Sequence, residues 1–280
     1  MTVGPESAVL DAASYMGVVA GSAPGREYKA FARRALDLHA GLEVVDIGCG
    51  PGTDLRALAD AVGPTGSVIG VDRDPRMLER AGSVADGAVI KVRQGDVHDL
   101  PLADATVDRA RTDRVLQHVD DPRRAIDEVR RVLRPGGRAV FAEPDWDTLA
   151  IAAEQVDASH RFRDHVRDVV VRNGHIGRQL AGHAHAVGLH VRSVDVVPGV
   201  FRDFALADTI LGIERNVERA IASGHLADGQ RQWVSGLRHE PFVATLTVFV
   251  VTVEKVPATG GANLSCRTPE PLRLLEAIDG

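Results

Sequence analysis

The sequence predicts an α/β fold in which helices cover a sheet of seven strands, most of them parallel. Two observations carry this prediction. Short apolar runs alternate with helical segments from residue 43 to residue 144, as expected for parallel strands joined by right-handed crossovers. The first apolar run ends in the loop "GCGPG", at the place where an open parallel sheet binds its ligand.

The bulk composition describes a globular protein. The chain has 280 residues, of which 44% are hydrophobic, enough for a large core. Its 39 acidic and 33 basic residues are mixed and the net charge is -6, so we expect no nucleic-acid partner. With no membrane-spanning run and no signal pattern, we expect a cytoplasmic protein without a membrane partner. Two cysteines, Cys49 and Cys266, predict neither a disulfide framework nor a metal site.

The predicted elements follow one another in a regular order. An amphipathic helix over residues 24–39 comes first, because its apolar residues recur on one face at helical spacing. Strands are predicted at 42–48, 67–72, 88–96, 107–113, 138–144, 190–203 and 242–256. The helix that precedes the fifth strand begins at an Asp cap with Pro122 in its first turn and stops at Gly136 and Gly137.

Two helical insertions interrupt this rhythm after the fifth and sixth strands. Phe162, Val166 and Val169 recur at helical spacing and predict an inserted helix. A second inserted helix is marked by Leu206, Ile210, Ile213, Val217 and Ile221, and a shorter third by Trp233 and Leu237. We therefore expect one domain over residues 1–256, with lid elements at about 1–40, 145–175 and 204–240, and a loosely attached tail at 257–280.

The spacing of the loop glycines restricts the ligand. A dinucleotide loop has the pattern G-x-G-x-x-G, in which the third glycine packs a helix under a pyrophosphate. Here Gly48, Gly50 and Gly52 follow the pattern G-x-G-x-G, and Thr53 stands where that third small residue belongs. The loop therefore indicates a nucleotide-like ligand and disfavours a nicotinamide-dependent dehydrogenase.

Five segments in order resemble the class I S-adenosylmethionine-dependent methyltransferases. They are "VVDIGCGPGT", "VIGVDRDPRML", "RQGDVHDLPLADATVD", "VLQHVDDP" and "VLRPGGRAVFAEP", which together cover about residues 44–144. The two insertions and "AEPDWDTL" resemble the bacterial small-molecule enzymes of that family, including the quinone-biosynthesis type. The resemblance implies a Rossmann-like sheet with an antiparallel last strand, N-terminal helices and helical lids. It also implies S-adenosylmethionine as cofactor, S-adenosylhomocysteine as product and a small-molecule substrate.

The resemblance assigns cofactor-binding roles to residues at the ends of the first three strands. Gly48 and Gly50 would let the backbone approach the methionine and ribose portions, and Asp46 would face the amino group. Asp72 would accept both ribose hydroxyls. The adenine would be bound by Asp96, by the backbone N–H of Val97, and by Arg73 and Met77 over its faces.

Further candidates border this predicted site. Tyr15 lies where similar enzymes use an N-terminal tyrosine to close over the cofactor, although simple packing is an equal alternative. Thr112 and Arg114 follow the fourth strand, where Arg114 would pair either with the cofactor's carboxylate or with Asp113 or Asp121 on the surface.

Methyl transfer from a sulfonium is an in-line displacement, so alignment and exclusion of water matter most. Where a base is needed, histidine is the default. His165 borders the apolar face of the inserted helix, His118 lies by the predicted cofactor site, and Asp145 follows the fifth strand with Glu143 and Trp146. These observations make His165, His118 and Asp145 the candidate catalytic residues.

The predicted function is methyl transfer to a small, largely apolar metabolite or natural product at O, C or N. The alternatives are a cyclase that binds S-adenosylmethionine without methyl transfer, the disfavoured dehydrogenase, and a non-catalytic binding protein. A homo-oligomer is compatible with an N-terminal lid helix that exchanges between subunits.

Overall fold

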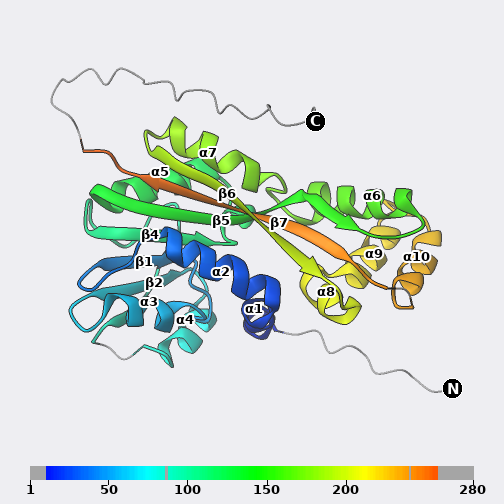
Figure 1. Cartoon of the computed structure of the whole chain (residues 1–280), viewed down its shortest axis with the longest axis horizontal. Coiled ribbons are helices and arrows are strands. Elements are labelled where there is room, and N and C mark those ends of the chain that lie inside the picture. The colour runs from blue at the N-terminus through cyan, green and yellow to red at the C-terminus, as the bar shows by residue number, and fades with distance from the viewer. Residues whose placement is uncertain (1–10, 86–87, 240, 258–280) are drawn as a thin grey trace, which may run out of the picture.

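The computed structural model describes residues 11–85, 88–239 and 241–257, and its centre is one seven-stranded sheet (Figure 1). The strands are β1 (Glu43–Ile47), β2 (Ser67–Asp72), β3 (Ile90–Gln94), β4 (Val107–Asp113), β5 (Leu133–Ile151), β6 (His190–Phe201) and β7 (Ala244–Glu254). Their order is β3-β2-β1-β4-β5-β7-β6, and β7 is antiparallel to both of its neighbours. The predicted fold class is confirmed. The predicted tail, except Pro257, lies outside the described residues.

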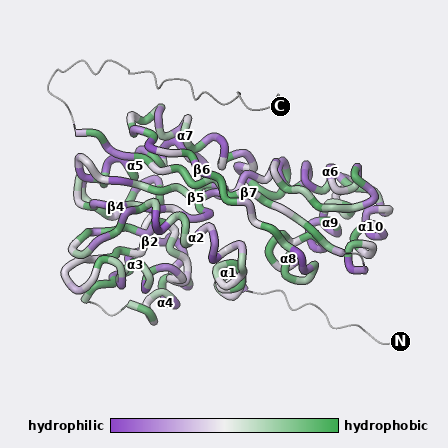
Figure 2. Tube along the Cα trace, in the orientation of Figure 1, coloured by the Kyte–Doolittle hydropathy of each residue, from purple (hydrophilic) through white to green (hydrophobic). Residues whose placement is uncertain are grey.

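Helices cover both faces of the sheet because successive strand residues point to opposite sides. Val44 of β1 belongs to the core under α2 (Ala23–Ala35), α3 (Leu55–Val62) and α4 (Pro75–Gly82). Val45 belongs to the core under α5 (Pro122–Val132) and α7 (Ile176–Ala186). Figure 2 shows the hydrophobic residues that run along β5, β6 and β7 between these layers.

The fifth strand is longer than the sequence predicts. It continues beyond residue 144 because its far end pairs with β7, where Ile151 lies opposite Ala244. The long ends of β5, β6 and β7 support a second group of helices (Figure 1). These are α6 (Val156–His165), the π-helical η2 (Val166–Val170), α8 (Phe204–Leu211), α9 (Ile213–Ala222) and α10 (Gly229–Leu237).

The helices α6, α8, α9 and α10, called the lid helices below, share a core of their own. The rings of Phe162 and Trp233 lie 5.8 Å apart between α6 and α10. The N-terminal helix α1 (Ala12–Gly21) joins this core through Val19. Among the described residues, no helix combines the length and hydrophobicity needed to cross a membrane.

The prediction of one continuous helix over residues 206–221 is wrong. Gly212 adopts the left-handed conformation with φ +65°, ends α8 and precedes α9. The side chain of Asp208 accepts a hydrogen bond from the backbone N–H of Glu214, 2.8 Å away, and stabilises this break. Helical periodicity continues across the break, so the pattern of apolar residues alone did not reveal it.

Candidate cofactor site

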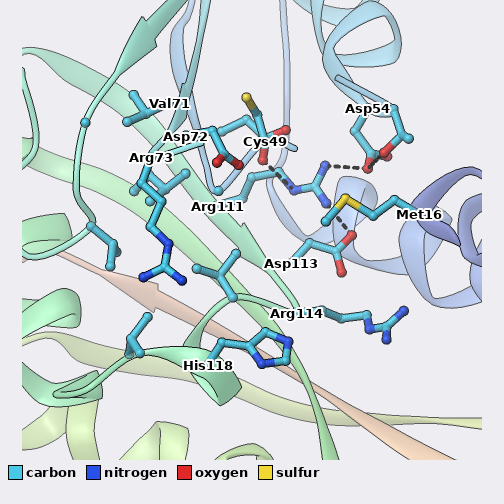
Figure 3. A pocket seen from close by; sticks show the side chains of 18 of the residues that line it. Met16, Cys49, Asp54, Val71, Asp72, Arg73, Arg111, Asp113, Arg114 and His118 are labelled. Carbon is cyan, nitrogen blue, oxygen red and sulfur yellow. Dashed lines mark hydrogen bonds and ion pairs between the residues drawn. The ribbon is translucent and has the colours of Figure 1, made fainter. Parts of the chain in front are cut away.

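A cavity of about 310 Å³ lies at the carboxyl ends of the first four strands (Figure 3). Nine of the residues that the sequence predicts for the site line it together. They are Tyr15, Asp46, Gly48, Asp72, Arg73, Asp96, Val97, Arg114 and His118. Segments far apart in the chain meet here because the carboxyl ends of parallel strands share one edge of the sheet.

The glycine loop is held in a conformation that favours glycine. Gly48 and Gly50 have φ values of +70° and +54°. A Cβ on Gly48 would lie 2.4 Å from a methyl carbon of Val115, and one on Gly50 would lie 2.7 Å from the sulfur of Met16. Both neighbours line the cavity. Glycine is therefore needed at these positions because the loop packs closely against Val115 and Met16. The sequence had suggested only that glycine makes room for a ligand.

The Asp72 carboxylate is fixed at the end of β2. One oxygen accepts the backbone N–H of Gly50 at 2.8 Å and the other accepts the backbone N–H of Asp74 at 2.9 Å. Gly50 itself does not line the cavity, so its part in the site is to orient Asp72. The carboxylate retains lone pairs that a ligand hydroxyl can use.

Asp96 follows β3 and is held by a local turn. Its carboxylate accepts hydrogen bonds from the backbone N–H of His98 at 2.8 Å and pairs with the His98 ring at 2.7 Å. These bonds hold the pKa of Asp96 below its usual range. The carboxylate is therefore an acceptor at neutral pH.

The floor of the cavity contains a buried cluster of charges, of which the sequence predicted only Asp46 as a site residue. Arg111 lies between three carboxylates. It is 3.3 Å from Asp54 and 2.7 Å from Asp113 (Figure 3), and 3.6 Å from Asp46. Lys29 of α2 pairs with Asp54 at 2.5 Å and also with Asp113. Burial raises the pKa of Asp46 to about 6, although Arg111 opposes this rise.

A sequence signal for this cluster exists in β4. Arg111 and Asp113 alternate in a strand that lies between two other parallel strands. Strands in that position are buried on both faces and are usually apolar. Charged residues at i and i+2 in such a strand therefore indicate a buried ion pair.

Arg114 and Tyr15 connect the sheet to the lid. The Arg114 guanidinium donates to the Tyr15 hydroxyl at 2.7 Å, and that hydroxyl donates to the carbonyl oxygen of Ile210 in α8 at 3.0 Å. Arg114 has a φ of +59°, rare for a residue with a side chain. It forms no ion pair with Asp113 or Asp121, so the surface alternative for Arg114 does not occur.

His118 lies in the loop after β4, and Glu143 lies in β5. Desolvation and the nearby charges of Arg114 and Arg73 lower the pKa of His118 to about 4, so its ring is neutral at pH 7. Glu143 is fully buried and accepts the backbone N–H groups of Val115 at 2.8 Å and Leu116 at 2.7 Å. It anchors the turn η1 (Leu116–His118) rather than lying at the rim of the site.

Two predicted cofactor residues lie outside the cavity. Thr112 is fully buried in β4, and within the described part of the chain its hydroxyl has no hydrogen-bond partner. Its neighbours in the strand, Arg111 and Asp113, line the cavity, so alternation turns Thr112 to the other face. Met77 lies partly buried on α4 and does not line the cavity.

Two predicted catalytic residues are also elsewhere. Helix α6 packs its apolar face against α10 instead of covering the cavity, and the His165 ring lies 5.4 Å from that of His225. Asp145 lies within β5, where it is fully buried and pairs with Arg178 of α7 at 2.5 Å. Neither side chain lines the cavity, so His118 is the predicted base that the fold brings there.

Three features together define a Rossmann-like methyltransferase fold. They are the antiparallel last strand, the glycine loop after β1, and the acidic residues at the ends of β2 and β3. A family model described as a methyltransferase domain matches residues 38–189, more than half of the chain. The chain therefore belongs to the class I S-adenosylmethionine-dependent methyltransferases.

The curated relatives include an uncharacterized protein and two named methyltransferases. An uncharacterized 37.1 kDa protein in transposon TN4556 of Streptomyces fradiae is 47% identical over 254 residues, which is 90% of this chain and 74% of that protein. A demethylmenaquinone methyltransferase of Staphylococcus aureus is 35% identical over 123 residues, 44% of this chain and 51% of the relative. An arsenite methyltransferase of Halobacterium salinarum is 39% identical over 118 residues, 41% of this chain and 29% of the relative. The matches to these two named enzymes thus cover about half of one and less than a third of the other.

Solved structures show the same fold. A putative methyltransferase from Bacillus halodurans has a TM-score of 0.58 at 16% identity, covering 81% of this chain and 98% of that structure. The [4+2]-cyclase SpnF has a TM-score of 0.53 at 19% identity, covering 83% of this chain and 82% of that structure.

Proposed function

We propose that this protein transfers the methyl group of S-adenosylmethionine to a small, largely apolar metabolite. The observation that carries the proposal is the single cavity in which Gly48, Asp72 and Asp96 meet. These residues come from the ends of β1, β2 and β3. Together they can bind the amino acid portion, the ribose and the adenine of one extended ligand. The acceptor atom is O, C or N.

The residues of the cavity fit this cofactor by charge and shape. Asp72, fixed by two backbone N–H groups, binds the ribose hydroxyls, while Asp96 and the Val97 backbone bind the adenine. Asp46 on the charged floor faces the amino group, and Gly48 leaves room for the methionine portion. When bound, the cofactor would supply a methyl group attached to a positively charged sulfur, and the sulfur loses this charge when the methyl group is transferred. The carboxylates of Asp46, Asp72 and Asp96 would attract the positively charged cofactor, and the surrounding protein would exclude water from the reaction.

His118 and Tyr15 complete the proposed site. Because the His118 ring is neutral at pH 7, its free nitrogen is available to accept a proton or a hydrogen bond. Tyr15 closes the cavity from α1 through its bonds to Arg114 and to the backbone of α8. The lid contacts thus position the walls, and the reaction needs alignment more than strong acid or base catalysis.

A soft acceptor such as arsenite is less well supported. Thiolates are the ligands that such acceptors prefer, and Cys49 is the single cysteine in the part of the chain that the structure covers. Its thiol is buried, and burial raises its pKa, so it stays protonated.

Incubation with methyl-labelled S-adenosylmethionine and a metabolite extract tests the proposal. Label in a small apolar product is the expected result. Tight cofactor binding without transfer to any acceptor would favour a cyclase instead. For the site, Asp72→Ala should weaken cofactor binding by about 1 to 3 kcal/mol, the range for hydrogen bonds with a charged group. Asp60→Ala, an exposed carboxylate of α3, is the matched control. Unchanged affinity in Asp72→Ala would remove Asp72 from the site.

A further inference from the structure

A second, smaller cavity of about 40 Å³ adjoins the cofactor site, and we call it the chamber. Its walls come from α1, α2, β5, β6, β7 and α8 and include Pro24, Trp146, Val197, Phe201, Leu246 and Val248. Val19, Tyr28 and Arg114 line both cavities. The chamber is therefore a mostly apolar extension of the site toward the lid.

The polar side chains in the chamber walls are nearly all engaged with the protein. The Ser22 hydroxyl donates to the carbonyl oxygen of Val19 at 2.7 Å, and the Tyr28 hydroxyl donates to Asp113 at 3.0 Å. The indole N–H of Trp146 donates to the side-chain oxygen of Gln117 at 2.8 Å. These three donors are therefore already used within the protein and are not available to orient a ligand in the chamber.

Arg114 is the exception. Its guanidinium has five N–H donors, and the hydrogen bond found for them goes to the neutral Tyr15 hydroxyl. No carboxylate of residues 11–85, 88–239 or 241–257 lies within ion-pair distance of it, whereas Lys29 and Arg111 nearby are surrounded by carboxylates. Arg114 is partly buried, and its guanidinium contacts no carboxylate of the described residues, so an anionic ligand group can pair with it there.

We infer that the chamber binds the apolar part of the methyl acceptor and that Arg114 binds an oxyanion of the same molecule, such as a carboxylate or phenolate. This inference rests on the proposed function. The cofactor already has Asp46, Asp72 and Asp96 to position it, whereas Arg114 is the one cation among the described residues that line the chamber. The rival occupant of Arg114 is the carboxylate of the cofactor, as the sequence suggested, and the experiment below separates the two.

Binding of a matched pair of probes tests the inference without methyl transfer. Butanoate and butanamide have the same short apolar chain, suited to the small chamber, and differ in charge. They are titrated into protein saturated with S-adenosylhomocysteine, and Trp146 fluorescence is read in a Trp233→Phe background, since the chain has two tryptophans. Butanoate should bind about 10- to 100-fold more tightly than butanamide, the effect of one hydrogen-bonded charge.

Variants assign that difference to specific groups. Arg114→Gln should bring the two probes to equal affinity, whereas Arg114→Lys should keep part of the preference. Val248→Phe, which fills the chamber, should weaken both probes and leave their ratio unchanged. Arg109→Gln removes an arginine from the other end of β4 and should change neither.

Three results would overturn the inference. The first is equal binding of both probes to the wild type, and the second is an unchanged preference in Arg114→Gln. The third concerns the cofactor: if Arg114→Gln weakens S-adenosylmethionine but not decarboxylated S-adenosylmethionine, and the probes do not differ, Arg114 serves the cofactor. Calorimetry of S-adenosylmethionine with the wild type is a separate measurement, and a failure to bind there would contradict the proposed function itself.

Discussion

Acidification below about pH 6 should weaken cofactor binding, because Asp46 then loses its charge. Asp46 is 4% exposed at the end of β1. Burial raises its pKa from 3.8 to about 6, and Arg111, 3.6 Å away, only partly opposes this rise. A carboxylate that faces the cofactor's ammonium group attracts it only when ionised. Binding should therefore be coupled to the release of a proton from Asp46.

The size of the effect follows from that pKa. At pH 5, about one tenth of the unliganded protein has Asp46 ionised, so affinity should be about tenfold lower than at pH 7. Above pH 7 it should no longer change through this group. His118, with its pKa of about 4, titrates mainly below this range. The sign for folding is opposite: Asp46 favours the folded state most at low pH, and this contribution falls as pH rises from about 3.8 through 6.

Titration calorimetry from pH 5 to 7, in buffers of different ionisation enthalpy, measures both affinity and proton release. Asp46→Asn is the control: its affinity should be lower than that of the wild type at pH 7 and independent of pH. A wild-type affinity that stays constant between pH 5 and 7, with no proton released, would refute the reasoning.

Three further predictions concern the scaffold. Glu143→Ala should lower the free energy of unfolding by about 1 to 3 kcal/mol for each buried N–H left unpaired, measured by urea denaturation. Glu143→Gln should lower the free energy of unfolding less than Glu143→Ala does. Burial raises the pKa of Glu143 to about 8, so the stability of the wild type should fall as pH rises from about 4.5 through 8, and Glu143→Gln should lack this pH dependence. Equal pH slopes in wild type and Glu143→Gln would contradict this. Gly48→Ala should cost more than Gly188→Ala in the same assay, because both have positive φ but only Gly48 lacks space for a Cβ; equal losses would show that the contact with Val115 is unimportant. Phe162→Ala in the lid should cost about 3 to 5 kcal/mol of stability while leaving cofactor affinity unchanged, and a parallel loss of affinity in calorimetry would show that the lid core shapes the cofactor cavity.

The sequence predicted those parts of the site that depend on topology. Gly48, Asp72 and Asp96 follow successive parallel strands, so any fold with right-handed crossovers brings them to one edge. The strand pattern was strong enough to identify that topology. The family's motifs then identified the class of enzyme, because the same residue types recur at those strand ends in the methyltransferases.

The parts that failed depend on packing between distant segments. Helical spacing showed that His165 borders the face of Phe162, but not that this face would meet Trp233 of α10 instead of the cavity. In the same way, nothing local to Asp145 indicates that Arg178, 33 residues later, would pair with it. Periodicity gives the direction of a side chain relative to its own element, while the partner depends on how the elements are placed.

Strand β5 connects the two cavities physically. Glu143 holds the backbone of η1, and Trp146, three residues later, holds Gln117 of the same turn while lining the chamber. The turn carries His118 at the cofactor cavity, and Arg114 just before it borders both cavities. Because a paired strand fixes side chains more rigidly than a loop does, the sheet sets the distance between the two cavities. Under the proposed function, the lid would therefore act mainly on which apolar molecule fits, through Ile210 and Leu211 of α8 in the chamber wall.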